Sequence, residues 1–149
     1  MAINPGSTST KVAVYDGETL MKELTLRHSA SDLAGFGNVV EEFGFRKEII
    51  LQALEDTGIE VGSLDAVIGR GGMLMPMASG VYTVDEVMKE DLSTCRYGQH
   101  ASNLGGLIAA DIASGIGVPA FIADPVVVDE LEDVARITGR PEIARVSIF

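Results

Sequence analysis

The stretch that decides the fold is Asn4-Pro5-Gly6-Ser7-Thr8-Ser9-Thr10-Lys11, with the apolar segment 1–3 before it and the alternating segment 12–15 after it. Gly6 permits backbone angles that other residues avoid, and Pro5 fixes its own φ. Residues 1–15 are therefore predicted to form a strand, a tight turn rich in hydroxyl groups, and a second strand that runs back. We call residues 4–11 the N-terminal turn.

The chemistry of the N-terminal turn suits a bound anion. Its serine and threonine side chains supply hydroxyls, Lys11 supplies a cation, and a tight turn exposes backbone N–H groups; together these groups can wrap a phosphate. An ordinary polar hairpin turn is the alternative. The pattern is not a P-loop, because no Gly-Lys-Ser/Thr follows at the required spacing and a strand rather than a helix comes next.

The composition indicates a single acidic domain. The chain has 149 residues, of which 46% are hydrophobic, and its 22 acidic residues outnumber its 11 basic ones. A chain of this length can bury a core. The negative net charge argues against nucleic acid or an anionic membrane as a partner. Any phosphate site must therefore be a local arrangement of N–H groups, lysine and Mg²⁺.

The cysteine content and the apolar segments exclude other classes. The single cysteine, Cys95, rules out an internal disulfide and a metal site built from several cysteines. No basic stretch followed by an apolar core opens the chain, so no signal peptide is expected. The longest apolar region, residues 104–123, is interrupted by Asp111 and Pro119 and is predicted to be a helix and a strand, not a membrane span. We expect a soluble, cytoplasmic protein.

Hydrophobic periodicity and turn signals predict alternating strands and helices after residue 10. Asp16-Gly17 marks a hairpin, so three antiparallel strands open the domain. Ser29 or Ser31 caps the helical segment that follows, and Asp85 caps a later helix. The predicted elements are strands at 10–15, 19–27, 64–68, 80–84 and 118–123, and helices at 36–54, 86–92, 104–116 and 129–137, with an extended end to residue 149.

This order of elements is typical of an α/β domain of ribonuclease H-like type: a mixed sheet with three opening antiparallel strands and helices on its faces. Ligands gather at the carboxyl ends of the parallel strands in such sheets. Arg70 and Asp124 follow the two strands predicted to be parallel, and the N-terminal turn follows the first strand. Three polar sites on one edge of the sheet indicate phosphate chemistry.

Four polar residues are candidates, and each has an ordinary alternative. Arg70 suits bidentate binding of a carboxylate or phosphate, or is a surface arginine in a glycine-rich loop. Asp124 is a base or the water-mediated partner of a metal ion, or a turn residue before Pro125. His100 can donate to a developing negative charge, or it is structural. Asn103 is expected to cap a helix.

Four separated blocks of sequence resemble the acetate and butyrate kinase family of acyl kinases, within the actin-like ATPase superfamily. The first block, residues 3–11, is similar to the family's opening phosphate signature, and the other three look specifically like the butyrate kinase branch. The similarity covers essentially all 149 residues. The three later blocks are Gly69-Arg70-Gly71-Gly72, Tyr97-Gly98-Gln99-His100-Ala101-Ser102-Asn103 and Ala123-Asp124-Pro125-Val126-Val127-Val128-Asp129-Glu130-Leu131.

The resemblance implies an actin-type ATPase domain and a phosphotransferase with a carboxyl acceptor. Such an enzyme uses ATP and Mg²⁺ to convert a short-chain carboxylate, butyrate or a branched relative, to an acyl phosphate. On the nucleotide side, Asn4 would belong to the Mg²⁺ site and Lys11 would contact the nucleotide phosphates. Ser7 and Ser9 would line the phosphate turn.

Arg70, His100 and Asp124 would be the catalytic residues by the same resemblance. Arg70 would hold the substrate carboxylate and the transferring phosphoryl group, and His100 would lie near that group. Phosphoryl transfer depends mainly on alignment and charge neutralisation, and a carboxylate nucleophile is already ionised at neutral pH. Asp124 therefore need not remove a proton, and its expected role is to orient metal-bound water.

The two glycines after Arg70 suggest a hypothesis about selectivity. The family's acetate kinases have bulky aliphatic residues there, whereas this chain has Gly71 and Gly72. The missing side chains are expected to leave room for a longer or branched acyl chain. Because one buried methylene contributes only about 1 kcal/mol, the selectivity should be modest.

Residues 1–149 are expected to be the N-terminal lobe of such an acyl kinase, with a C-terminal lobe absent from this chain. We expect this part alone to be inactive, because half of the catalytic groups are missing, and the full-length enzyme to be a homo-oligomer. Two other functions stay open. One is another actin-like phosphotransferase, such as a sugar kinase, or a phosphatase acting on polyphosphate; the other is a non-catalytic module that binds phosphate or a nucleotide.

Overall fold

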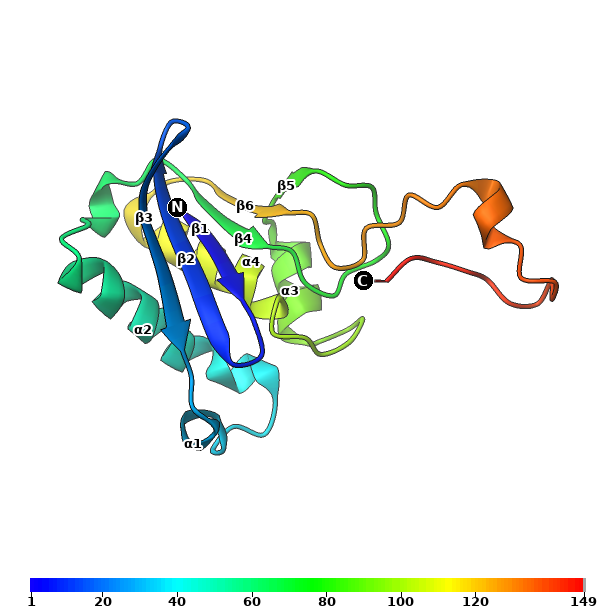
Figure 1. Cartoon of the computed structure of the whole chain (residues 1–149), viewed down its shortest axis with the longest axis horizontal. Helices are drawn as coiled ribbons and strands as arrows, with labels where there is room; N and C mark the ends of the chain where they lie inside the picture. Colours follow the sequence, from blue (N-terminus) through cyan, green and yellow to red (C-terminus); the bar gives the residue numbers. More distant parts are fainter. Residues whose placement is uncertain (149) are drawn as a thin grey trace.

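The computed structural model describes residues 1–148 as a mixed six-stranded sheet with helices packed on it (Figure 1). The strand order is β3-β2-β1-β4-β6-β5. β1, β4 and β6 run parallel, β2 and β3 follow β1 in antiparallel pairs, and β5 lies antiparallel beside β6 at the far edge. The strands are β1 (Ala2–Pro5), β2 (Ser9–Asp16), β3 (Thr19–Arg27), β4 (Val67–Arg70), β5 (Val81–Thr83) and β6 (Ala120–Ala123).

The opening strands form because apolar residues alternate with polar ones and turn residues separate the runs. Ile3, Val12 and Val14 point into the core and are at most 8% exposed. Gly17 adopts a φ of +56° in the turn between β2 and β3, a left-handed conformation that costs glycine nothing sterically. The prediction of three opening antiparallel strands is confirmed.

The two long helices cover the same face of the sheet. α4 packs on β1, β4 and β6, and α2 packs beside it on β2 and β3 (Figure 1). Ile50, Leu54, Leu104 and Ile108 are completely buried there, and each such burial contributes roughly 1.5–3 kcal/mol. The helices are α1 (Ala30–Leu33), α2 (Phe43–Asp56), α3 (Glu86–Ser93) and α4 (Asn103–Ile116), and the 3₁₀ turns are η1 (Val39–Glu42), η2 (Val61–Ser63) and η3 (Asp133–Arg136).

Capping residues begin and end these helices. Ser29 and Asp32 form a capping box at the start of α1, and the Asp85 carboxylate accepts the N–H of Met88 at the start of α3. α4 ends at Gly117, which has a φ of +75°. No helix within residues 1–148 is long and apolar enough to cross a membrane.

α4 lies on β4 as closely as backbone atoms allow. A Cβ atom on Gly69 would lie 2.1 Å from the carbonyl oxygen of Gly105, and a Cβ atom on Gly105 would lie 2.3 Å from that of Arg70. Cβ atoms in proteins essentially never approach another heavy atom within 3.0 Å. Both positions therefore require glycine, and this contact fixes Arg70 at the end of β4 against the first turn of α4.

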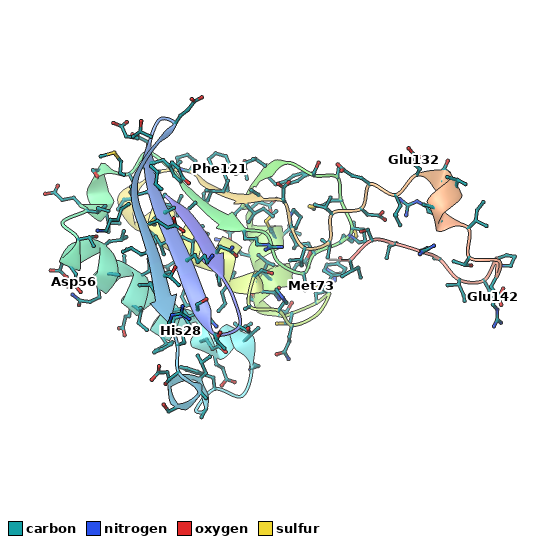
Figure 2. All side chains as sticks on the ribbon, in the orientation of Figure 1. His28, Asp56, Met73, Phe121, Glu132 and Glu142 are labelled. Atoms are coloured by element: carbon teal, nitrogen blue, oxygen red, sulfur yellow. The ribbon has the colours of Figure 1, made fainter. Side chains whose placement is uncertain are left out.

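The helix predicted at 129–137 is wrong. Only η3 is helical there, and Val134 and Ile137, which would form the apolar face of a helix, are 69% and 71% exposed. A short helix with no surface on which to bury its apolar face is not stable. The segment instead forms an arm that leaves the sheet, with Glu132 and Glu142 far from it (Figures 1 and 2).

Two other predictions need a correction or a limit. The strand predicted at 64–68 begins only at Val67, because η2 ends at Ser63 and residues 64–66 form an irregular link to β4. The extended end is present as an irregular segment, but Phe149 lies outside the described residues.

Candidate functional site

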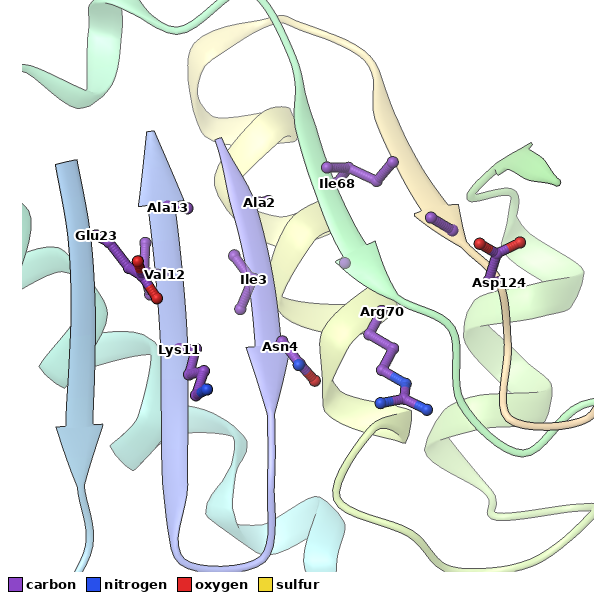
Figure 3. Close-up of a pocket in the computed structure, with 12 residues that line it drawn as sticks. Ala2, Ile3, Asn4, Lys11, Val12, Ala13, Glu23, Ile68, Arg70 and Asp124 are labelled. Atoms are coloured by element: carbon purple, nitrogen blue, oxygen red, sulfur yellow. The ribbon is translucent and has the colours of Figure 1, made fainter. Parts of the chain in front are cut away.

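Four of the predicted site residues line one pocket on the face of the sheet opposite α2 and α4 (Figure 3). They are Asn4, Lys11, Arg70 and Asp124, and the pocket has a volume of about 380 Å³. The expected convergence of the ends of β1, β4 and β6 is therefore confirmed. Small and apolar residues line the pocket between the polar ones: Ala2, Ala13, Ile68 and Ala123.

Strand register places these side chains next to one another. Asn4 of β1 lies opposite Lys11 of β2, while their neighbours Ile3 and Val12 point into the core. Because side chains alternate along a strand, Asn4 and Lys11 share the open face. Arg70 ends β4, which runs parallel to β1, and reaches the same face.

Lys11 and Arg70 are cations without a carboxylate partner. No ion pair among residues 1–148 involves either of them, although acidic residues outnumber basic ones 22 to 11. Glu23 also lines the pocket but is not paired with Lys11. Lys11 and Arg70 share the pocket with the carboxylates of Glu23 and Asp124, but neither cation is held in an ion pair within residues 1–148, so both are available to bind an anionic ligand.

The Asp124 carboxylate is held in place by the segment before β5. Its Oδ1 accepts a hydrogen bond of 2.9 Å from Gly80 N–H, and its own N–H donates to Gly80 O at 3.0 Å. Asp124 has a φ of +37°, which is uncommon for a residue with a side chain and is disfavoured before a proline. Backbone strain of this kind gathers at functional sites, and here it fixes the orientation of a pocket carboxylate.

Ser7 lies in the tip of the N-terminal turn and Ser9 begins β2, and neither residue lines the pocket. The N–H of Gly6 donates to Ser9 O at 2.7 Å and closes the turn. The N–H groups of Ser7 and Thr8 make no hydrogen bond to any other described residue. Backbone N–H groups left in this state are suited to binding an anion.

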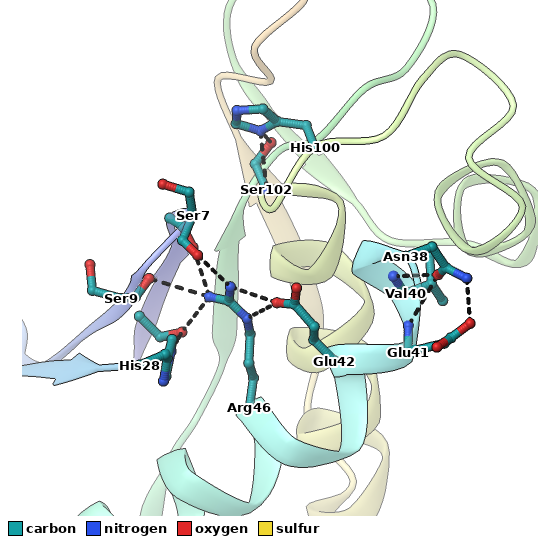
Figure 4. A network of polar contacts seen from close by, with 12 residues as sticks. Ser7, Ser9, His28, Asn38, Val40, Glu41, Glu42, Arg46, His100 and Ser102 are labelled. Carbon is teal, nitrogen blue, oxygen red and sulfur yellow. Dashed lines mark hydrogen bonds and ion pairs between the residues drawn. The ribbon is translucent and has the colours of Figure 1, made fainter. Parts of the chain in front are cut away.

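His100 does not line the pocket, but the charge of Arg70 acts on its ring. The ring Nδ1 accepts the N–H of Ser102 at 3.2 Å and lies 2.6 Å from Ser102 Oγ, so the neutral ring carries its proton on Nε2 (Figure 4). Burial first, and the positive charge of Arg70 second, lower the pKa of His100 from its ordinary value of 6.5. The ring is therefore neutral at pH 7 and can donate from Nε2.

Arg70→Gln is expected to raise the pKa of His100, because it removes one of the two causes that lower it. The value should stay below 6.5, since burial, the larger cause, remains. An NMR titration of the histidine rings measures the shift. His28 is the internal control, because its pKa is lowered by burial and by Arg46. Superimposable His100 titrations in the two proteins would disprove the coupling.

The prediction that Asn103 caps a helix is wrong. The cap position of α4 is occupied by Ser102, one residue earlier, and the Ser102 side chain makes no capping hydrogen bond. Asn103 is completely buried; its Oδ1 accepts the N–H of Met73 at 2.8 Å, and its Nδ2 donates to Gly98 O at 2.9 Å. Asn103 thus ties the loop that follows Arg70 to the loop that carries His100.

The hypothesis that Gly71 and Gly72 leave room for a longer acyl chain is contradicted. A Cβ atom on Gly71 would lie 2.6 Å from Cα of Pro125, and one on Gly72 would lie 2.6 Å from Cα of Asn103. Both glycines are buried against neighbouring backbone, so no ligand space opens there. Valine at either position would separate these loops rather than alter the choice of acid.

Sequence reasoning missed Arg46 and His28, which are buried behind the N-terminal turn at 1% and 4% exposure. Arg46 lies on α2 at helical spacing from Phe43 and Ile50, within the apolar stripe of the helix. A charged residue in such a stripe was the signal that could have revealed it. His28 carries no comparable signal, because its sequence position is that of an ordinary residue at the end of a strand.

Asn4, Glu23 and Asp124 line the pocket with side-chain oxygen atoms that a metal ion could bind. The part of the chain that the structure describes contains no group of three His, Cys, Asp or Glu residues that could hold one. Mg²⁺ is commonly bound by one or two protein groups, with waters and substrate phosphates as the other ligands. The donor set therefore fits Mg²⁺ that arrives with a nucleotide.

Similarity to curated proteins extends along the whole chain. The chain is 56% and 52% identical to butyrate kinases 1 and 2 of Clostridium acetobutylicum, and 51% identical to a probable butyrate kinase of Listeria innocua, each over 149 residues. The chain is a homologue of the butyrate kinases. It spans 42% of the length of each of these relatives. No protein-family model matches it.

Solved structures show the same fold. The acetate kinase of Porphyromonas gingivalis matches 94% of this chain with a TM-score of 0.56 at 12% identity, and that of Entamoeba histolytica matches 95% with a TM-score of 0.55 at 15% identity. The matches cover 40% and 38% of those chains. Acetate kinases have an actin-like ATPase fold, so the predicted ribonuclease H-like, actin-type α/β class is confirmed.

Proposed function

We propose that this chain is the N-terminal lobe of an ATP-dependent acyl kinase that phosphorylates a short-chain carboxylate, butyrate or a branched relative, to an acyl phosphate. The observation that carries the proposal is the pocket lined by Lys11 and Arg70, unpaired among residues 1–148, together with the unbonded N–H groups of Ser7 and Thr8 in the turn that Lys11 ends. An extended ligand with several anionic oxygens would accept hydrogen bonds from both cations and from the turn N–H groups. The 50–56% identity to butyrate kinases supports the same assignment.

Lys11 and the N-terminal turn would bind the nucleotide phosphates. Lys11 supplies a point charge, Ser7 and Ser9 supply hydroxyl groups, and the turn supplies N–H groups. Asn4 would hold Mg²⁺ together with the nucleotide, and the ion would neutralise phosphate charge. Because these groups are fixed between two paired strands, they need little reorganisation when charge shifts during transfer.

Arg70, His100 and Asp124 would act at the transferring phosphoryl group. The guanidinium of Arg70 can bind the acceptor carboxylate and phosphoryl oxygens in a bidentate manner. His100, neutral with its proton on Nε2, can donate to a phosphoryl oxygen without adding a second full charge beside Arg70. The acceptor carboxylate is ionised at pH 7, so Asp124, held by Gly80, orients water instead of acting as a base.

A second lobe would supply the remaining groups. The pocket lies on the face of the sheet that α2 and α4 leave uncovered, and the curated relatives are more than twice as long as this chain. Phosphoryl transfer requires all reacting groups to be aligned and shielded from water. We therefore expect no kinase activity from residues 1–149 alone. The complete enzyme would be a cytoplasmic homo-oligomer.

Acyl phosphate formation tests the proposal. The full-length protein that contains this chain, incubated with Mg-ATP and butyrate, should form butyryl phosphate, which hydroxylamine traps as a hydroxamate. The chain of residues 1–149 should form none above a control without protein. Butyryl phosphate from this chain alone would contradict the two-lobe proposal. Transfer to a sugar, or ATP binding without transfer to any carboxylate, would support one of the alternative functions instead.

A further inference from the structure

Arg46 is a buried cation that the proposed mechanism does not use. It lies on α2, and its side chain is 1% exposed. Moving a guanidinium from water into a protein interior is costly unless hydrogen bonds and an opposite charge compensate it. The partners of Arg46 therefore indicate what its position achieves.

The guanidinium of Arg46 binds the N-terminal turn from the core side (Figure 4). Its Nη1 donates to Gly6 O at 2.8 Å and to Ser9 O at 3.3 Å, and its Nη2 donates to Ser7 O at 3.3 Å. Nη1 also donates to Thr10 Oγ1 at 3.1 Å. One side chain thus gathers three backbone carbonyls of the turn.

These bonds occupy the carbonyl groups of the turn but leave some of its N–H groups without a partner in the described chain. The remaining carbonyl in its tip, Thr8 O, accepts the N–H of His28 at 2.9 Å, so every carbonyl from residue 6 to residue 9 has a donor within the protein. The N–H groups of Ser7 and Thr8 have no acceptor among the described residues. Because free carbonyl lone pairs repel an anion and free N–H groups attract it, this arrangement prepares the turn for phosphate.

Arg46 cannot act on the ligand directly. It is buried, and Glu42 compensates its charge: Nε donates to Glu42 Oε2 at 2.7 Å, and Nη2 lies 2.6 Å from the same oxygen. His28 adds a neutral contact, with its Nε2 2.9 Å from Thr10 Oγ1. The effect of Arg46 on a bound anion must therefore pass through the backbone of the turn.

We propose that Arg46 is the positioning residue of the phosphate-binding turn: it turns the carbonyls of Gly6, Ser7 and Ser9 toward the core and so leaves N–H groups for the ligand. The ligand named here rests on the proposed function. The ordering of the turn by Arg46 is independent of the proposed function, because the hydrogen bonds of Arg46 form without any ligand.

Amide NMR of the 149-residue chain tests the proposal, first without ligand and then during titration with Mg-ATP. Arg46→Lys keeps the charge but can donate hydrogen bonds to only some of the three turn carbonyls. Arg46→Met keeps the aliphatic stem and removes all of these hydrogen bonds. Without ligand, both variants should shift the amides of residues 6–9 and speed the exchange of Gly6 N–H about tenfold. The affinity for Mg-ATP, measured from the amide shifts of Ser7 and Thr8, should fall about tenfold in Arg46→Lys and further in Arg46→Met. A tenfold change is the factor expected for a charge-assisted hydrogen bond.

Lys47→Met is the matched control. Lys47 is the adjacent cation on α2, and its ammonium pairs with Asp111 of α4 at 2.9 Å rather than with the turn. An ion pair as exposed as this one contributes little to stability. The Lys47→Met chain should therefore show the same chemical shifts of the turn amides, and the same titration with Mg-ATP, as the wild type. If Arg46→Met does not fold, Arg46→Lys decides the question.

The outcomes separate this proposal from the proposed function. A folded Arg46→Lys chain with wild-type turn amides and a wild-type Mg-ATP response would overturn the role of Arg46. If the wild-type amides of Ser7 and Thr8 do not respond to Mg-ATP, the nucleotide site is contradicted, and the exchange measured without ligand still decides whether Arg46 orders the turn.

Discussion

Gly105→Ala, which adds a single methyl group, is expected to lower the free energy of unfolding by at least about 3 kcal/mol or to prevent folding. The added Cβ would lie 2.3 Å from the carbonyl oxygen of Arg70. Because that atom belongs to the backbone, no side-chain rotation can relieve the contact. α4 would have to move off β4, which opens the core that both elements bury. Urea denaturation followed by far-UV circular dichroism measures the loss.

Gly115→Ala is the matched control on the same helix. A Cβ atom there would meet nothing within 4 Å, so alanine should stabilise α4 by up to about 1 kcal/mol through its higher helix propensity. The two substitutions thus have opposite expected signs. Equal stabilities of the two variants would show that α4 and β4 are not packed at backbone contact.

Arg70→Gln is expected to reduce kcat/KM for acyl phosphate formation by the full-length enzyme on the order of 10³-fold. Glutamine is too short to replace the guanidinium and carries no charge to neutralise the phosphoryl oxygens. The stability should change by less than about 0.5 kcal/mol, because Arg70 is exposed and forms no ion pair within residues 1–148. Steady-state kinetics and urea denaturation of the same preparation separate the two effects.

Two further variants define the role of Arg70. Arg70→Lys keeps a point charge without the bidentate geometry, so its kcat/KM should lie between those of the wild type and the glutamine variant. Lys22→Gln removes another cation that has no ion pair in the described chain, but one that does not line the pocket, and it should keep wild-type kinetics. Wild-type kcat/KM in Arg70→Gln would exclude Arg70 from the reaction.

Local patterns were sufficient to predict the opening antiparallel strands and the shared edge on which the polar site residues lie. Alternation in residues 10–15 and 19–27 and the Asp16-Gly17 turn specify the opening hairpin through neighbouring residues alone. The meeting of Asn4, Lys11, Arg70 and Asp124 followed from one rule, that the carboxyl ends of parallel strands share an edge. Such features depend on neighbours in sequence or on strand order, and both can be derived from the chain.

Features that depend on distant contacts could not be predicted. Arg46 contacts the N-terminal turn, and Asn103 joins two loops, only after α2 and α4 have docked on the sheet. Gly71 and Gly72 seemed to leave open space because the chain that fills it, at Asn103 and Pro125, is remote in sequence.

The prediction of a helix at 129–137 failed for a related reason. The apolar spacing of this segment resembles that of a helix, but Val134 and Ile137 are 69% and 71% exposed and so have no core surface in the described chain to pack on. Secondary structure that depends on tertiary burial cannot be inferred from spacing alone.

The most direct test of the central claim, that the N-terminal turn and Arg70 form one phosphate site, is an amide NMR titration of the 149-residue chain with Mg-ATP. The predicted result is that the amides of Ser7 and Thr8 shift together with the side-chain Nε–H of Arg70, that inorganic phosphate competes for the same shifts, and that the arm of residues 129–148 does not respond. Saturable shifts elsewhere in the chain, with residues 4–11 and Arg70 unchanged, would contradict the claim.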